Sequence, residues 1–278
     1  MKKFTQALVF SVSLLAIASC GAAKPSASST STPSLVPTSS SSPTAPIDQA
    51  ATIYFVGDTG TQLRLYSELW EIPADNGESA LSVILSGKQP KDPDYVNLWP
   101  AGSKLQALTI QGDLAIIDVN FTALNVGAEA ESLALEQLSR TVVSLHSDIT
   151  KVQFIRDGKV VETFAGHVDT SQPIAIDEGY SSLATIDINQ NENEQLENPV
   201  VITGLACTFE ANVPWELSQN GKVIDSGAVT AKEACPVRSP WKVDLGNLDP
   251  GTYTFRTWES SMKDGSLINE DTKTFVVK

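Results

Sequence analysis

The sequence predicts two folded domains: an α+β domain with helices on one face of a mixed sheet, followed by an all-β sandwich. Strand-like and helix-like stretches alternate over residues 52–176, without the regular strand–helix–strand order of a doubly wound sheet. No helical stretch is expected over residues 199–278, where short strands recur between turn residues. Residues 177–198 are polar and rich in Asn, Gln and Glu, so they are predicted to be a linker that few contacts cross.

Residues 1–19 are predicted to be a signal peptide for export. Lys2 and Lys3 precede an apolar run from Ala7 to Ala18, which is shorter than the ~20 apolar residues that a membrane-spanning helix needs. The run ends in Ile17-Ala18-Ser19-Cys20-Gly21, which resembles the lipobox of bacterial lipoproteins. This resemblance implies cleavage before Cys20 and attachment of a diacylglycerol to its thiol. The alternative is a soluble secreted protein with an incidental cysteine near its cleavage site.

Residues 20–51 are predicted to be the lipidated cysteine and a disordered stalk. From Lys24 to Ile47 the chain consists mostly of Ser, Thr and Pro, and it has too little apolar surface to build a core. A lipid anchor with two acyl chains holds a protein stably at a membrane. We therefore expect the folded part to stand off the extracytoplasmic face of the cell membrane, with the membrane as one partner.

The first domain is expected over residues 52–176. β-branched and aromatic residues predict a strand at 52–56, and the pairs Gly112-Asp113 and Asp157-Gly158 predict the turns of two hairpins. The clearest helix runs from Ala128 to Leu145, because apolar residues recur along it at spacings of three and four. The other elements expected are an extended segment at 69–72 and a short helix at 79–86.

The second domain is expected over residues 199–278 as a sandwich of short strands. The pairs Asn220-Gly221, Pro250-Gly251 and Asp264-Gly265 mark turns between them. Strands are expected at 200–205, 215–219, 222–229, 241–245, 252–259 and 272–277.

Cys207 and Cys235 are predicted to form a disulfide, because both lie in the same domain of a chain that carries an export signal. In the chain-entropy model such a bridge stabilises the fold by roughly 3–4 kcal/mol. The rival interpretation is a pair of reduced cysteines that serve as small apolar side chains. A metal site is not expected here, since two isolated thiols without a nearby histidine supply too few ligands.

The acidic composition argues against a nucleic-acid partner. Thirty-three Asp and Glu residues stand against 19 Lys and Arg residues, which gives a formal net charge of −14 at pH 7. Such a surface repels phosphate backbones, and no stretch gathers the basic residues that nucleic-acid binding requires. No nucleic-acid partner is therefore predicted.

No catalytic residues are expected, and the chain is interpreted as a non-enzyme. His146 lies at the end of the long predicted helix, where the helix dipole favours a cation, and His167 follows Gly166. Asp118 and Asp148 were candidates to form a triad with His146, but nothing in their spacing selects them over other carboxylates. The sequence contains no nucleophile elbow, H-E-x-x-H pair or Walker-type loop.

No cofactor and no metal are expected. The stretch from Asp187 to Asn191 reproduces the D-x-N-x-N opening of a calcium-binding loop. The sixth position of that loop should be Gly and is Glu192, and the twelfth should be Glu and is Asn198. Because these two positions define the loop's geometry, the stretch is interpreted as part of the polar linker.

Aromatic residues of the second domain leave two interpretations open. They form either the buried core that a sandwich needs or a surface on which a carbohydrate or a protein docks. The residues concerned are Trp215, Trp241, Tyr253 and Trp258.

Both domains resemble a known family when the order of their motifs is considered. Residues 52–174 resemble the GerMN domain of bacterial sporulation and germination proteins. The matching segments are Ile53-Tyr54-Phe55, Ser86-Gly87, Ala101–Leu105, Leu114–Val119, Glu131–Leu135 and Val152–Lys159. Residues 199–278 resemble the immunoglobulin-like domain that often follows GerMN. The matching segments there are Phe209–Val213, Pro250–Phe255 and Lys263–Ser266.

The resemblance implies an envelope-associated module without known catalytic residues. We therefore expect a non-catalytic binding or assembly function, with an envelope protein or the cell wall as the partner. The alternative is an extracellular lipoprotein that binds a solute or a glycan. A concave pocket lined with aromatic residues would favour the alternative, whereas an apolar patch or an exposed strand edge would favour assembly.

Overall fold

The computed structural model describes residues 48–60, 62–177 and 180–278, which belong to one compact unit. The predicted signal peptide, the lipidation site Cys20 and nearly all of the predicted stalk lie outside the described residues. The large hydrophobic core of the first domain ends at Ala184, and that of the second begins at Ile186. In the part of the chain that is described, neither helix is long and apolar enough to cross a membrane.

A long antiparallel hairpin opens the first domain. β1 (Asp48–Asp58) pairs with β2 (Leu63–Pro73), and β3 (Tyr95–Val96) pairs with the other edge of β1. Gly57 is required at the end of β1, because a Cβ atom there would lie 2.7 Å from the ring of Tyr66. Both long strands extend beyond the segments that the sequence predicts. Their outer residues do not form a marked apolar run, so the sequence does not indicate that they belong to a strand.

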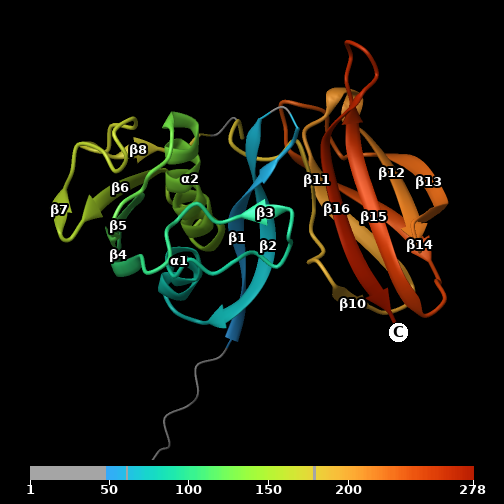
Figure 1. Ribbon diagram of the computed structural model, residues 1–278, viewed down its shortest axis with the longest axis horizontal. Helices are drawn as coiled ribbons and strands as arrows, with labels where there is room; N and C mark the ends of the chain where they lie inside the picture. The colour runs from blue at the N-terminus through green and yellow to red at the C-terminus, as the bar shows by residue number, and fades with distance from the viewer. Residues whose placement is uncertain (1–47, 61, 178–179) are drawn as a thin grey trace, which may run out of the picture. The chain divides into compact units, whose positions relative to one another are not determined.

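A second, mixed sheet completes the first domain (Figure 1). Its order is β4 (Lys104–Gln111), β5 (Leu114–Asn120), β6 (Lys151–Arg156) and β7 (Lys159–Val160), and β8 (Ile174–Ala175) also pairs with β6. β4 and β5 form the first predicted hairpin. β5 and β6 run parallel, because helix α2 (Ala128–Leu145) crosses between them.

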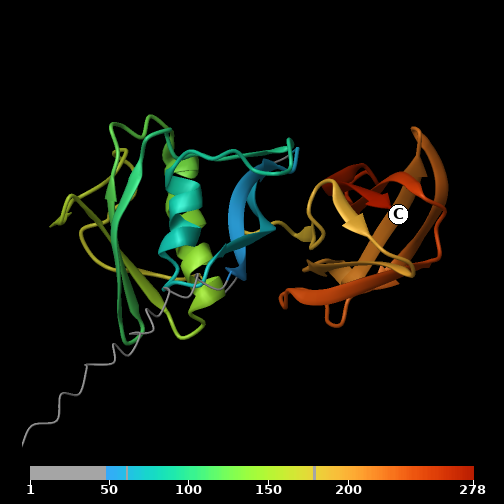
Figure 2. The ribbon, with the colours of Figure 1, turned by 90° about the horizontal axis from the view of Figure 1, so that it is seen from below.

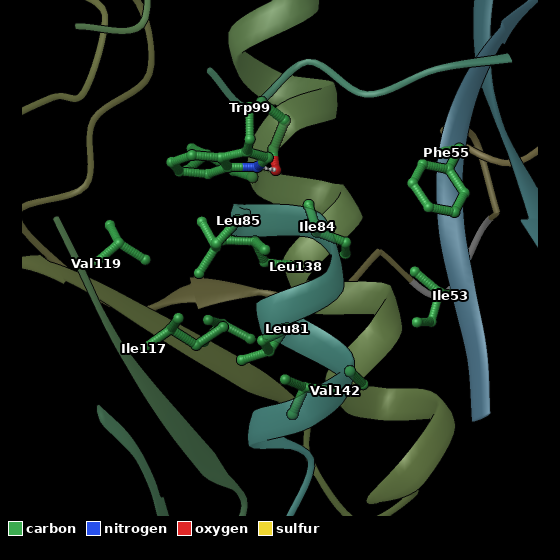
Figure 3. Packing of buried hydrophobic residues seen from close by; sticks show 14 of the residues in the cluster. Ile53, Phe55, Leu81, Ile84, Leu85, Trp99, Ile117, Val119, Leu138 and Val142 are labelled. Carbon is green, nitrogen blue, oxygen red and sulfur yellow. Dashed lines mark hydrogen bonds between the residues drawn. The ribbon is translucent and has the colours of Figure 1, made fainter. Parts of the chain in front are cut away.

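The two helices lie between the two sheets (Figure 2). The α+β class is confirmed, but the prediction of a single sheet is corrected, because β1 and β2 form a sheet of their own on the other side of the helices. Figure 3 shows Ile53 of β1 and Ile117 of β5 on opposite sides of α1 (Glu78–Leu85) and α2. The apolar stripe of α2 faces this core, with Leu138 and Val142 completely buried.

The second domain is a sandwich of two sheets. One sheet has the order β10 (Glu194–Leu196), β16 (Leu267–Val277), β15 (Gly251–Ser260), β12 (Asn212–Gln219) and β13 (Lys222–Thr230). The other has the order β14 (Ser239–Gly246), β11 (Val200–Ala206) and β9 (Ile186–Ile188). A single 3-10 turn, η1 (Phe209–Ala211), precedes β12. All six predicted strands are present.

The polar segment 177–198 differs from the predicted linker. It contributes β9 to one sheet of the second domain and β10 to the other. Ile186 and Ile188 are buried, and Asp187 between them is buried as well. The strand β9 was not predicted, because it is short and is followed by a stretch rich in Asn, Gln and Glu. Contacts also cross from this segment to the first domain. The side-chain Oδ1 of Asn191 accepts the N–H of Leu69, and its Nδ2 donates to the carbonyl oxygen of Leu69.

Candidate functional site

A disulfide joins Cys207 to Cys235, whose Cα atoms are 4.5 Å apart. Cys207 follows β11, and Cys235 lies in the connection from β13 to β14. The backbone N–H of Cys235 also donates to the carbonyl oxygen of Thr208 at 3.2 Å. The bridge therefore fixes two connections of the second domain to one another.

The disulfide should stay closed until the protein is reduced. In a chain carrying Cys20→Ala, alkylation under denaturing conditions should add no mass without reductant and two alkyl groups after reduction. Reduction should lower the melting temperature by roughly 10 °C, because it returns loop-closure entropy to the unfolded chain. Two alkylated thiols in the unreduced sample would contradict the bridge.

The structure gives the candidate catalytic residues separate structural partners. The Nε2 atom of His146 lies 3.2 Å from the carbonyl oxygen of Asn76, next to the end of α2. The carboxylate of Asp118 accepts the N–H of Gly158 in the turn after β6. Among the described residues no hydrogen bond joins either histidine ring to Asp118 or Asp148. The triad considered from the sequence is therefore not assembled here.

The calcium-like stretch begins in a strand, because Asp187 and Ile188 lie in β9, and Asn189 to Asn191 follow that strand. Asp187 lies in β9, accepts the hydroxyl of Ser67 at 2.7 Å and pairs with Arg238 at 3.0 Å. The described part of the chain contains no group of three or more His, Cys, Asp or Glu side chains that could hold a metal ion.

Trp215, Trp241 and Tyr253, three of the four aromatic residues considered as a docking surface, belong to the core of the second domain. Trp215 and Trp241 are buried and stack on Phe255, with ring centroids 5.7 and 6.2 Å away. Tyr253 is buried against Phe275. Trp258 is partly exposed, but the guanidinium of Arg256 lies 5.1 Å from its ring. These rings therefore do not form an open stacking surface.

A buried charge cluster, the junction cluster, links the two domains. It consists of Asp92 and Tyr95 of the first domain with Asp271 and Lys273 of the second. The side chains of Lys273 and Asp92 are 1% and 2% exposed, and the ammonium group pairs with that carboxylate. The same ammonium group donates to the hydroxyl of Tyr95 and lies 3.4 Å from Asp271. The Tyr95 hydroxyl in turn donates to Asp271 at 2.7 Å.

Several elements position the junction cluster. Asp92 lies between α1 and β3, where buried Glu68 of β2 accepts the N–H groups of Lys91 and Asp92 at 3.0 and 2.9 Å. Tyr66 stacks on Tyr95 with ring centroids 4.7 Å apart. The strand alternation of β16 places Asp271 and Lys273 on the face that also carries Phe275. The cluster was not predicted from the sequence, although two opposite charges at the alternate positions before Phe275 were a signal for it.

The protonation states follow from burial and pairing. Burial lowers the pKa of Lys273, but the carboxylates of Asp271 and Asp92 outweigh this effect and hold it above 10.5. Burial raises the pKa of Asp271 to about 6, although Lys273 and the hydrogen bonds favour its ionised form. The ammonium group of Lys273 is therefore charged at neutral pH and fully engaged, which gives the cluster a structural role.

Three connections of the second domain meet at one end of the sandwich, because successive strands run in opposite directions. They span residues 207–211, 231–238 and 261–266 and are called the loop end below. The β15–β16 hairpin extends beyond the sandwich at this end (Figure 1). Loops at the ends of such sandwiches are common binding sites, because the sheets hold them in place.

A groove of about 430 Å³ lies at the loop end. Its lining includes Thr208, Phe209, Glu210, Glu259 and Met262. Phe209 is 61% exposed and Met262 is 83% exposed, which is unusual for side chains of this size and polarity. In the sequence, Phe209 stands out only as part of the family resemblance, because residue type does not reveal exposure. We take this groove as the candidate binding site.

Comparisons with known proteins agree with this architecture. Residues 52–162 match the family model Germane, described as sporulation and spore germination, and residues 188–266 match Gmad2, the immunoglobulin-like domain of bacterial spore germination. No curated protein matches the chain. The described part of the chain thus consists of an α+β domain followed by a β-sandwich domain. The chain belongs to the proteins in which a Germane (GerMN) domain is followed by the immunoglobulin-like domain of bacterial spore germination.

Solved structures with some similarity include a provisionally assigned lipoprotein from Clostridium perfringens, with 23% identity, a TM-score of 0.34, and coverage of 46% of this chain and 87% of that one. The tandem GerMN domains of the Bacillus subtilis sporulation protein GerM give 16% identity and a TM-score of 0.38, with coverage of 49% and 50%. The first GerMN domain of the same protein gives 18% identity and a TM-score of 0.36, with coverage of 46% and 96%.

Proposed function

We propose that this chain is a lipoprotein on the extracytoplasmic face of the cell membrane, where it acts as a non-catalytic binding or assembly module. Its process is of the sporulation or germination type that the descriptions of both domain families name. Cys20 would fix the position, the segment after it would supply reach, and the folded domains would hold an envelope partner.

The groove at the loop end carries the binding part of this proposal. It is open, it displays Phe209 and Met262 to solvent, and a disulfide fixes the connection that contains Phe209. Nucleophilic catalysis needs a nucleophile within hydrogen-bond reach of a base. The described residues that line the groove include hydroxyls and the carboxylates of Glu210 and Glu259, but no hydrogen bond joins a lining hydroxyl to either carboxylate. The arrangement suits recognition of a partner rather than catalysis.

A solute-binding function has one observation in its favour. A cavity of about 250 Å³ at the domain junction is lined by Tyr66, Tyr95 and several carboxylates, including Asp58 and Glu270. The two tyrosine rings, however, stack on each other, and both hydroxyls donate within the protein: Tyr66 to the backbone carbonyl oxygen of Glu270 at 3.3 Å and Tyr95 to the carboxylate of Asp271 at 2.7 Å. Both side chains are also buried, with exposed fractions of 2% for Tyr66 and 5% for Tyr95, so they offer a sugar little surface for stacking. Partner binding is therefore the better-supported function.

The anchor is tested by replacing Cys20 with alanine. The wild-type protein should enter the detergent phase of a Triton X-114 partition, because two acyl chains give stable membrane binding. The Cys20→Ala protein should stay in the aqueous phase. An unchanged partition of the variant would contradict the lipoprotein part of the proposal.

The binding role is tested by photo-crosslinking in intact cells. A photoreactive phenylalanine analogue at position 209 should give a discrete crosslinked species, whereas the same analogue at position 160 should not. Val160 is a matched control, because it is also a large apolar residue with 57% exposure, but it lies in β7 of the first domain. The same weak background at both positions would contradict a partner at the loop end.

A further inference from the structure

We propose that the groove at the loop end binds a basic peptide segment of its partner, in which lysine or arginine residues flank one large apolar side chain. This inference rests on the proposed function, because it names the class of partner for the same groove. It follows from four features of the groove: its apolar residues, its charge, an unpaired hydroxyl and its rigid support.

The apolar residues come from two different connections. Phe209 belongs to the connection from β11 to β12, and Met262 belongs to the tip of the β15–β16 hairpin. An unbranched methionine adapts its shape to an incoming side chain, which suits it to binding surfaces. A partner that placed one large apolar side chain between these residues would remove both from water.

The charge of the groove is negative. Glu210 and Glu259 belong to its lining, and no lysine, arginine or histidine of the described chain does. Lys263 lies in the same hairpin tip but outside the lining. The whole chain is also acidic, with a formal net charge of −14. A basic segment complements this field, whereas an acidic one would place like charges together.

One residue that lines the groove, Thr208, has a buried hydroxyl without a partner in the described part of the chain. Thr208 is 1% exposed, and its Oγ1 atom has no hydrogen-bond partner among the described residues. Buried polar atoms are nearly always paired, so an exception calls for an explanation. A threonine hydroxyl both donates and accepts. The hydroxyl of Thr208 therefore marks a polar position directly behind the lining of the groove that lacks a partner among the described residues of the free chain.

The support of the groove is rigid. Residues Glu210 and Ala211 both have positive φ angles, of 54° and 56°, which side chains other than glycine seldom adopt. The surrounding contacts hold this conformation: Ala211 donates its N–H to Thr208, Ala231 donates to Ala211, and the disulfide closes the base of the loop. A preformed groove loses less conformational entropy on binding than a flexible loop does.

The proposal is tested with four labelled heptapeptides, KSKFKSK, KSKSKSK, ESEFESE and SSSFSSS, titrated into the folded wild-type chain. We expect KSKFKSK to bind at least tenfold more tightly than each of the others, because only it carries both features. Equal binding of KSKFKSK and KSKSKSK would reduce the effect to attraction by the net charge and would overturn the proposal. Equal binding of KSKFKSK and SSSFSSS, or binding of no peptide, would overturn it too.

Variants of the chain then test whether the peptide binds in the groove at the loop end. Phe209→Ser and Met262→Ser should each weaken KSKFKSK binding about tenfold, and Glu259→Gln should weaken it several-fold. Val160→Ser and Glu197→Gln are matched controls that alter exposed residues outside the groove and should leave binding unchanged. Unchanged melting curves would show that each variant is folded. Equal effects of groove and control variants would overturn the site.

The two levels of the proposal fail separately. A specific crosslink at position 209 in cells, together with no binding of KSKFKSK, would refute a basic peptide as the ligand and leave the binding function intact. Peptide binding without any crosslink at position 209 would support the groove's chemistry and contradict its use in the cell.

Discussion

Replacing Lys273 with methionine should lower the free energy of unfolding by about 3–5 kcal/mol and the melting temperature by on the order of 10 °C. Methionine keeps an unbranched apolar chain of similar length, so the loss isolates the ammonium group. That group is the cation to which the buried carboxylates of Asp92 and Asp271 are paired. Without it, two buried carboxylates lack a counter-ion and must either stay charged at high cost or bind protons.

The pH dependence of this effect has a defined sign. The pKa of Asp271 is about 6 in the folded chain, against an ordinary value of 3.8. A carboxyl group whose pKa is raised by folding binds its proton more tightly in the folded state, so its ionisation costs stability as the pH rises. Removing Lys273 should raise this pKa further. The variant should therefore lose more stability at about pH 8 than at about pH 5.

Two further variants control this experiment. Lys222→Met removes an exposed lysine from β13 and should change the free energy of unfolding by less than about 0.5 kcal/mol. The triple variant Lys273→Met/Asp92→Asn/Asp271→Asn removes the carboxylate charges as well and should recover at least half of the loss, because no unpaired buried charge remains. A loss for Lys273→Met no larger than that for Lys222→Met would show that the junction cluster is not paired in solution.

The sequence predicted the helices, strands and turns whose formation depends on neighbouring residues alone. The helix Ala128–Leu145 has the bounds that its apolar stripe predicts, and the turn at Gly112-Asp113 joins β4 to β5 as expected. In both cases the residues that predict the element are the residues that form it. The six sandwich strands were predictable for the same reason, because turn residues and alternating burial define each of them locally.

Features that depend on distant partners were not predictable. Nothing near Ile186 and Ile188 in the sequence shows that a strand partner lies at Gly204 to Ala206, so the local composition predicts a linker where the structure has a strand. Nothing near Lys273 shows that Asp92 lies within reach, since the two are separated by most of the folded chain. Tertiary context decided both cases. The groove was hidden for the same reason, because its lining comes from three separate stretches.

Glu131 is a second buried charge whose role depends on a distant segment. It lies in the first turn of α2, and its side chain is completely buried. Both carboxylate oxygens accept backbone N–H groups from the segment after β7: one binds Phe164 and Ala165, and the other binds His167 and Val168. Burial raises its pKa, but these bonds and one from the hydroxyl of Thr163 outweigh burial and lower it below 4.5.

Replacing Glu131 with glutamine should therefore lower the free energy of unfolding by about 2–4 kcal/mol at neutral pH. The amide NH₂ of glutamine takes the place of one oxygen and faces N–H donors that it cannot accept, so at least two buried donors lose their partner. Hydrogen exchange should accelerate over residues 163–168 more than elsewhere, because these donors are the ones released.

The effect of this replacement should shrink in acid. A carboxylate whose pKa is lowered by folding contributes stability above the pKa of the unfolded chain and loses it as the pH falls through the lower, folded value. Wild-type and Glu131→Gln proteins should therefore differ most near pH 7 and approach one another as the pH falls below the ordinary value of 4.5. Glu129→Gln is the matched control, because Glu129 lies in the same first turn but is exposed. It loses its interaction with the helix dipole, about 0.3–1 kcal/mol, and the attraction between its carboxylate and Arg64. Equal losses for the two variants would mean that the helix dipole, rather than the bonds to residues 163–168, accounts for the contribution of Glu131.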